Sequence, residues 1–211
     1  MKKEFEKRVY SSLIIIPISF FFIFQGSVFF IFFLSLFFFA TIYEWIKMSK
    51  KNYILRFLGL FFLFFSFYSA FYIRENSGLA FFISITLICI STDIGGYIFG
   101  NIFKGPKLTK ISPNKTYSGV VGGILFALIA GLSHIKYMGY NIFEADVIKI
   151  LIGILFVSIV SQIGDLVISY FKRKAKLKDT GKIIPGHGGL LDRIDGLIFV
   201  MPVVYLHMYI L

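Results

Sequence analysis

Seven apolar segments, separated by short polar ones, make up most of the chain. An α-helix needs about 20 apolar residues to cross a bilayer, and open strands are excluded in lipid because their backbone polar groups would stay unpaired. The pattern therefore predicts an all-α, polytopic integral membrane protein with about seven transmembrane helices. We expect these helices at residues 10–25, 27–46, 57–73, 79–100, 118–137, 148–170 and 197–211.

Basic residues divide unevenly between the two sides that this topology creates. If the N-terminus is cytoplasmic, 19 of the 22 Lys and Arg residues lie in cytoplasmic segments, and only Arg74, Lys136 and Lys149 lie outside them. The positive-inside rule therefore favours a cytoplasmic N-terminus, and we expect the cell (inner) membrane as the location. Anionic lipid head groups account for the net charge of +11, so no nucleic-acid partner is expected.

Apolar and polar segments alternate along the whole chain, which indicates a single membrane-embedded domain over residues 1–211. Within it, we expect N-terminal hydrophobic helices over 1–78 and a catalytic part over 79–211. The catalytic part would carry two cytoplasmic loops, at 101–117 and 171–196.

The first apolar segment follows a basic start, as in a signal peptide, but no small-residue cleavage site follows, so we expect a retained first helix. Cys89 is the only cysteine, which excludes an intramolecular disulfide and a cysteine-based metal site.

Two aspartates lie inside segments that are otherwise apolar. Asp93 lies near the inner end of the fourth predicted span and Asp165 near the inner end of the sixth. A carboxylate at a helix centre in lipid costs about 2.5 to 3.5 kcal/mol, so such residues need partners. Ser161, Asp165 and Ser169 are spaced i, i+4, i+8 and form one polar stripe. We expect the stripe to line a cavity that leads to the cytoplasmic loop.

Small and polar residues elsewhere in the spans have simpler interpretations. Gly96 with Gly100, and Gly119 with Gly123, have the spacing that lets membrane helices approach closely, and we assign them to helix packing. Glu44 ends the second span beside a tryptophan, and we interpret it as an interfacial anchor outside the site.

The two cytoplasmic loops carry groups that suit a phosphorylated substrate. Arginine makes two-pronged phosphate contacts and lysine acts as a point charge, although attraction to the lipid surface explains about half of the lysines. The basic candidates are Lys104, Lys107, Lys110, Lys115, Arg173, Lys178 and Arg193.

Glycines and carboxylates of the second loop add to this picture. Gly186, Gly188 and Gly189 flank His187, and glycines at this density let the backbone present its amides to a phosphate. Phosphate oxygens and one or two carboxylates are the usual ligands of Mg²⁺. Asp165 paired with Asp192, across two helices, is our candidate for such a site.

The residues from Ser169 to Asp195 resemble the C-terminal signature of phosphatidate cytidylyltransferases, also called CDP-diacylglycerol synthases. The positions that match are Ser169, Lys172, Arg173, Lys178, Asp179, Gly181, Pro185, His187, Gly188, Gly189, Asp192, Arg193 and Asp195. Further upstream, the family's second polar segment matches at Asp93, Tyr97, Gly100, Lys107, Ile111, Ser112, Pro113, Lys115, Thr116 and Gly119. One position departs: Ser118 stands where the family usually has an acidic residue.

This resemblance implies transfer of a cytidylyl group from CTP to phosphatidate, with Mg²⁺ as cofactor and the site facing the cytoplasm. The implied catalytic residues are Asp165, Lys172, Arg173, Lys178, Asp179, His187, Asp192, Arg193 and Asp195, with Asp165 and Asp192 as metal ligands. The implied substrate-binding residues are Asp93, Lys107, Ser112, Lys115, Thr116, Ser169, Gly188 and Gly189. For His187, contact with a phosphate and a structural role at a helix start both stay open. The bilayer and, by resemblance, a second copy in a homodimer are the expected partners.

Three other functions stay open on the sequence alone. A CDP-alcohol phosphotransferase would carry a D-G-x-x-A-R and G-x-x-x-D-x-x-x-D pattern, which the chain lacks. A polyprenol kinase would differ in nucleotide selectivity. An ion-coupled transporter would use the intramembrane aspartates as an ion path, but the halves show no inverted repeat and the polar groups gather at one face.

Overall fold

The computed structural model describes residues 2–109, 111–139 and 146–210, and the part described is built of helices without a strand. All seven helices are long and apolar enough to cross a bilayer, which confirms the all-α prediction. Their bounds are α1 (Lys2–Gln25), α2 (Ser27–Met48), α3 (Tyr53–Asn76), α4 (Leu79–Phe103), α5 (Tyr117–Tyr137), α6 (Val147–Lys174) and α7 (Leu191–Ile210).

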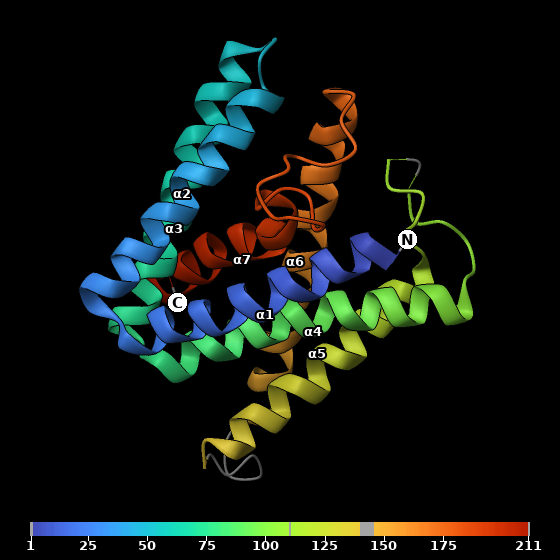
Figure 1. The fold of residues 1–211 in the computed structure, drawn as a ribbon. Helices are drawn as coiled ribbons and strands as arrows, with labels where there is room; N and C mark the ends of the chain where they lie inside the picture. The colour runs from blue at the N-terminus through green and yellow to red at the C-terminus, as the bar shows by residue number, and fades with distance from the viewer. Residues whose placement is uncertain (1, 110, 140–145, 211) are drawn as a thin grey trace.

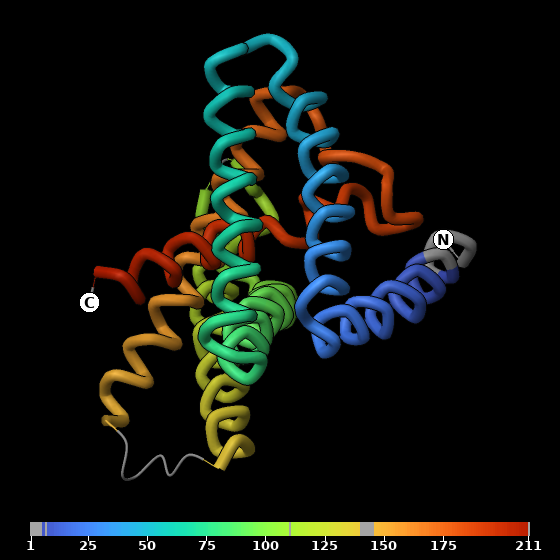
Figure 2. Tube along the Cα trace, turned by 90° about the vertical axis from the view of Figure 1, so that its left-hand side faces the viewer, coloured from blue at the N-terminus to red at the C-terminus, as the bar shows by residue number. Residues whose placement is uncertain are grey.

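The helices associate as sequential pairs. α2 and α3 form an antiparallel hairpin, α4 packs along α5, and α7 crosses α6 and also contacts α3 (Figure 1). α1 contacts α2 and extends away from the rest of the bundle at its N-terminal end (Figure 2). α7 therefore joins the N-terminal hairpin to the C-terminal helices.

The polar connections gather toward one side of the molecule. In Figure 1 the start of α1, the α2–α3 turn, the α4–α5 loop and the α6–α7 loop lie toward the top and right. The α1–α2 and α3–α4 turns, the end of α5 and the end of α7 lie toward the bottom and left. The basic segments of the sequence are therefore on one side, as an alternating topology requires.

The last helix begins earlier than its hydropathy predicts. The sequence places it at 197–211, whereas α7 begins at Leu191 and includes Asp192 and Asp195. The first turn of α7 is polar, and a search for apolar runs does not detect a polar helical turn. The sequence therefore places the start of this helix too late. The helical part of the other spans also extends past the apolar run, most clearly in α1, which begins at Lys2.

Glycines hold α4 and α5 in close contact. A Cβ built at Gly95 would overlap the carbonyl oxygen of Gly122, and one built at Gly119 would lie 2.8 Å from the carbonyl oxygen of Gly96. Another at Gly123 would lie 2.9 Å from the carbonyl oxygen of Thr92. Without an aqueous hydrophobic effect between membrane helices, this close packing supplies much of their association. This confirms the assignment of Gly96, Gly100, Gly119 and Gly123 to helix packing, and it adds Gly95 and Gly122, which the sequence prediction did not include.

We expect Gly95→Ala to separate α4 from α5 and to lower the free energy of unfolding by about 1 to 3 kcal/mol, the usual cost of overpacking. Thermal unfolding in detergent measures this. The matched control is Gly153→Ala on α6, where an added Cβ meets no atom within 4 Å. Equal midpoints for the two variants would contradict the packing role of Gly95.

Candidate active site

The polar stripe of α6 meets the loop that precedes α5. Ser169 donates a hydrogen bond from Oγ to Oδ1 of Asp165 at 3.3 Å, and Lys115 forms an ion pair with Oδ2 of the same carboxylate. Ser161, one turn earlier, is fully buried, and its hydroxyl has no hydrogen-bond partner among the described residues. The stripe therefore faces the protein interior, and Lys115 brings the loop between α4 and α5 to it.

Two further carboxylates lie around this ion pair. Asp195 of α7 is 7% exposed and lies within electrostatic reach of Asp93, Asp165 and the ammonium group of Lys172. Asp93 of α4 is also within reach of Lys115. Three helices thus place their carboxylates around the inner end of the bundle, with lysines between them.

Asp192 lies one turn before Asp195 and contacts four donor groups. Lys172 of α6 donates from Nζ to Oδ1 at 2.7 Å, in an ion pair that is largely buried. Oδ2 accepts bonds from the backbone N–H groups of Thr180 at 2.8 Å and Gly189 at 3.2 Å, and it lies 3.0 Å from the Thr180 hydroxyl. This hydroxyl has a single proton, which Asp192 shares with Glu44. Asp192 therefore fixes the α6–α7 loop to both helices.

Glu44 holds this loop from the opposite side, and its interpretation as an interfacial anchor is wrong. The side chain is 0% exposed and accepts bonds from the hydroxyl of Thr180 at 2.8 Å and from the backbone N–H groups of Leu190 at 2.9 Å and Leu191 at 2.8 Å. These amides belong to the start of α7. The first N–H groups of a helix have no partners within the helix, and the N-terminal end of a helix attracts negative charge. Glu44 is therefore the anion that caps α7.

His187 links the loop to α1. Its Nδ1 lies 2.9 Å from Oγ of Ser11, and its carbonyl oxygen accepts bonds from Nε of Arg193 at 3.1 Å and from Nη2 at 2.6 Å. Arg8 donates from Nε to the carbonyl oxygen of Gly186 at 2.8 Å. Burial lowers the pKa of His187 below its usual range, and the charges of Arg193 and Arg8 lower it further. The imidazole is therefore neutral at neutral pH.

Some predicted site residues lie apart from these clusters. Arg173 donates to the carbonyl oxygen of Leu177 at 3.2 Å, and Lys178 and Asp179 are exposed on the loop. Asp179 borders Gly188, where an added Cβ would lie 3.4 Å from its Cβ and from Oδ2 of Asp192. These exposed groups surround the rim of the site.

The residues of the first loop have mostly local contacts. The hydroxyl of Thr116 caps α5 by accepting the Gly119 N–H at 3.1 Å, and the carbonyl oxygen of Ser112 accepts the N–H of Lys115 at 3.0 Å. Lys107 pairs with Thr116 in an isolated β-bridge. Ser118, at the position where the family usually has an acid, hydrogen-bonds to the carbonyl oxygen of Lys104 and thereby closes the loop.

Sequence reasoning missed three contributors to the site: Glu44, Thr180 and Ser11. Each acts through a partner distant in sequence: Thr180 meets Glu44 across 136 positions and Ser11 meets His187 across 176. The available signal for Glu44 was a carboxylate inside an apolar run, because such a group requires a partner.

Among the described residues, no three His, Cys, Asp or Glu side chains are arranged to hold a metal ion by themselves. Asp165 and Asp192 each hold a lysine ammonium group instead. The site is thus a set of carboxylates balanced by positive charge, next to exposed basic groups and loop amides, and it can bind an anionic phosphate group near the membrane surface.

Comparison with known proteins agrees with this geometry. The family model described as the cytidylyltransferase family matches residues 50–211, which include α3 to α7 and both loops of the site. This chain belongs to the cytidylyltransferase family. The match leaves α1 and α2, which carry Ser11 and Glu44, entirely outside the matched range. The loop between α6 and α7, residues 175–190, carries much of the C-terminal signature, and we call it the signature loop. In this member of the family, part of the support of the signature loop therefore comes from the N-terminal helices.

Curated relatives match part of the chain. The phosphatidate cytidylyltransferase of Staphylococcus haemolyticus is 41% identical over 133 residues, which are 63% of this chain and 50% of the relative. The protein of the same name from Staphylococcus aureus is 42% identical over 134 residues, again 63% of this chain and 50% of the relative. The chain thus spans about half the length of the curated relatives it matches.

We expect Glu44→Ala to detach the signature loop from α2, because it leaves the backbone amides of Leu190 and Leu191 without an acceptor. Each unsatisfied buried group costs about 1 to 3 kcal/mol, so the variant should lose several kcal/mol of stability, while Glu44→Gln should lose less. Thermal unfolding and limited proteolysis of the loop measure this. Glu75→Gln is the control, since Glu75 is partly exposed and bonds to the N–H of Ser27. Wild-type behaviour of Glu44→Ala would contradict the capping role.

His187 should make the stability depend on pH. Its pKa is lowered on folding, so the unfolded chain binds this proton more readily, and stability falls as the pH decreases below about 6.5. Unfolding midpoints at pH 5.5 and 7.5 should differ more in the wild type than in His187→Gln. The same pH dependence in both proteins would show that the lowered pKa does not affect folding.

Proposed function

We propose that this chain transfers the cytidylyl group of CTP to phosphatidate, releasing pyrophosphate and forming CDP-diacylglycerol. Membership of the cytidylyltransferase family and the names of the relatives support the reaction class. The observation that carries the proposal is the pairing of two aspartates with two lysines, Asp165 with Lys115 and Asp192 with Lys172, at the inner ends of α6 and α7. Such a site binds phosphates at a depth that a membrane lipid can reach.

The reaction needs positioning more than proton transfer. A phosphate monoester has a second pKa near 6 and is mostly a dianion at neutral pH, so the lipid phosphate is a nucleophile without a general base. One of its oxygens forms a bond to the α-phosphorus of CTP while the bond from that phosphorus to the bridging oxygen breaks. Pyrophosphate leaves with the electron pair. The chain's task is to align the two phosphates and to neutralise the charge on the leaving group.

We assign Mg²⁺ as the cofactor and Asp165 and Asp192 as its ligands. The donor chemistry fits: carboxylates and phosphate oxygens are the ligands that Mg²⁺ takes, and both aspartates already lie beside a cation, the ammonium group of Lys115 or Lys172. When bound, the ion supplies positive charge to the phosphates of CTP. Because Lys172 already donates to Oδ1 of Asp192, this carboxylate would hold the ion only where the ammonium group gives way.

Basic groups near these carboxylates would bind the phosphates. Lys115 and Lys172 lie at the carboxylates themselves, and Arg193 lies beside His187 at the start of α7. The remaining proposed contacts come from exposed or loop groups and from the buried Ser169 of α6, and Asp93 and Asp195 keep the lysines in place. This second set consists of Lys107, Ser112, Thr116, Ser169, Arg173, Lys178, Asp179, His187, Gly188 and Gly189.

The proposal also covers the orientation of the chain in the membrane and its assembly. Seven apolar helices make the chain a membrane protein, and we place the N-terminus and both site loops on the cytoplasmic side of the cell membrane because 19 of its 22 basic residues then face inward. We treat residues 1–211 as one membrane-embedded domain with its catalytic part at 79–211. A homodimer is compatible with this arrangement.

We expect Asp165→Asn to reduce Mg²⁺-dependent formation of CDP-diacylglycerol by at least about 100-fold, which is the loss of a few kcal/mol of transition-state stabilisation. The measurement is the incorporation of labelled CTP into lipid by purified protein with phosphatidate. Asp146→Asn is the matched control on the same helix, because Asp146 is exposed at its far end and pairs with Lys149 at 2.9 Å. Equal activity of the two variants would contradict the role of Asp165.

A further inference from the structure

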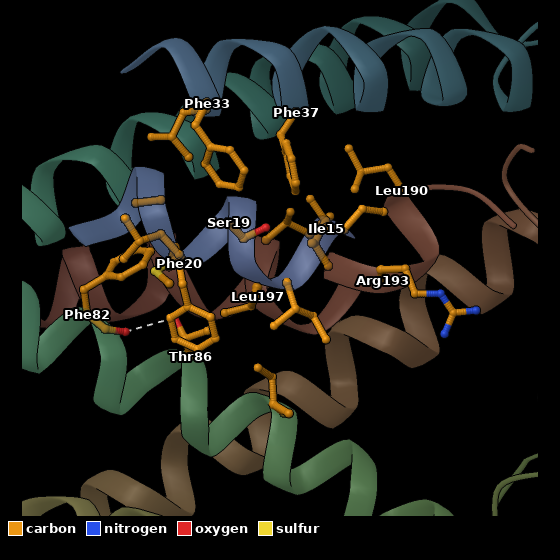
Figure 3. Close-up of a pocket in the computed structure, with 18 of the residues that line it drawn as sticks. Ile15, Ser19, Phe20, Phe33, Phe37, Phe82, Thr86, Leu190, Arg193 and Leu197 are labelled. Atoms are coloured by element: carbon orange, nitrogen blue, oxygen red, sulfur yellow. Dashed lines mark hydrogen bonds between the residues drawn. The ribbon is translucent and has the colours of Figure 1, made fainter. Parts of the chain in front are cut away.

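A cavity of about 460 Å³ lies beside α7 and the loop that precedes it. Side chains from α1, α2, α3, α4 and α7 and from the loop before α7 line it. Ile15 and Phe20 of α1, Phe37 of α2, Phe82 of α4 and Leu197 of α7 surround the space in Figure 3. Its volume is within the range of about 300 to 1,000 Å³ that is usual for pockets that bind small molecules.

The charged groups of this cavity lie at one end. Arg193 and His187 line the end nearest the signature loop, and the guanidinium group of Arg193 points away from the phenyl rings (Figure 3). Arg8 bonds to Gly186 in the same loop, so a second guanidinium group lies near this end. The rest of the lining is almost entirely aliphatic and aromatic, apart from a few hydroxyl groups such as that of Ser19. The cavity is thus apolar along its length and positively charged at its mouth.

The apolar walls and the positively charged mouth indicate which kind of ligand the cavity binds. A nucleotide would bury its polar base and ribose against apolar walls without hydrogen-bond partners, which is costly. A fatty acyl chain gains from these walls, at about 0.8 kcal/mol for each buried CH₂. An anionic head group attached to that chain would then lie at Arg193, and Arg suits phosphate because of its fork of N–H donors.

We propose that this cavity binds an acyl chain of phosphatidate, with the lipid phosphate held at Arg193. The inference rests on the proposed function and adds to it the place where the lipid lies. Arg193 is within electrostatic reach of Asp93, so the phosphate would lie beside the carboxylate cluster of the active site. α1, which lies outside the matched residues 50–211, forms one wall and connects to the loop through the Ser11–His187 contact. The N-terminal helix thus becomes part of the lipid site.

Photo-crosslinking locates the lipid without relying on turnover. The probe is phosphatidate with a diazirine in one acyl chain, added to the full-length protein in phosphatidylcholine nanodiscs, with the adducts mapped by mass spectrometry. We expect adducts at Ile15, Phe37 and Leu197 that unlabelled phosphatidate suppresses and additional phosphatidylcholine does not. Adducts confined to outward-facing residues such as Phe39 and Ile129, or equal suppression by both lipids, would overturn the proposal.

A variant that fills the cavity tests the same point through substrate choice. Ser19 lies seven residues beyond Ser12, about 10 Å farther along α1. Ser19→Phe should therefore reduce kcat/KM for dioleoyl-phosphatidate about tenfold relative to dioctanoyl-phosphatidate, the equivalent of two methylene groups at about 0.8 kcal/mol each. Ser35→Phe, on α2 outside the cavity, is the matched control and should leave this ratio unchanged. An equal loss for both lipids in Ser19→Phe would overturn the proposal.

These outcomes test the proposed lipid site and the proposed reaction independently. Suppressible adducts in the cavity, together with the absence of cytidylyl transfer by folded protein, would contradict the proposed function and retain the lipid site. CDP-diacylglycerol formation with adducts outside the cavity would retain the function and remove the lipid site.

Discussion

The hydrogen bonds of the Glu44 carboxylate are the constraint on which the rest of the site depends. A fully buried carboxylate is expensive in a membrane protein unless its oxygens are satisfied, and Glu44 meets this requirement with two amides of the α7 start and the hydroxyl of Thr180. The bonds fix where α7 begins. They also attach the loop between α6 and α7 to the N-terminal hairpin of α2 and α3. The hairpin and the C-terminal helices are thereby held together.

The arrangement of the proposed catalytic residues follows from this anchor. With α7 starting at Leu191, Asp192 reaches Lys172 on α6 and Asp195 lies one turn deeper, near Asp165 and Asp93. Thr180 bonds both to Glu44 and to Asp192, so the structural carboxylate and the proposed metal ligand share a partner. A shift of the loop would therefore alter the positions of the reacting groups as well as the stability of the fold. Asp165 and Asp192 each pair with a lysine, and Glu44 accepts bonds from the amides at the start of α7.

Local patterns in the sequence predicted the parts of this structure that depend on near neighbours. The seven helices follow from apolar runs, the α4–α5 contact from glycines four residues apart, and the stripe from Ser161 to Ser169 from helical periodicity. The family resemblance named the residues of the loop but not their contacts. Glu44 was misinterpreted because its partners lie 136 to 147 positions away, and the start of α7 was misplaced because its first turn is polar. Such bonds depend on tertiary structure and leave no periodic signal.

The central claim is that the carboxylate and lysine site at the inner end of the bundle serves cytidylyl transfer to a membrane lipid. The most direct measurement is the identity of the lipid product formed by the purified wild-type chain from phosphatidate and Mg²⁺, with CTP and ATP offered separately. The account predicts CDP-diacylglycerol and pyrophosphate from CTP, and no nucleotidyl lipid from ATP. A lipid that has gained only a phosphoryl group, or no lipid product from folded protein, would contradict it.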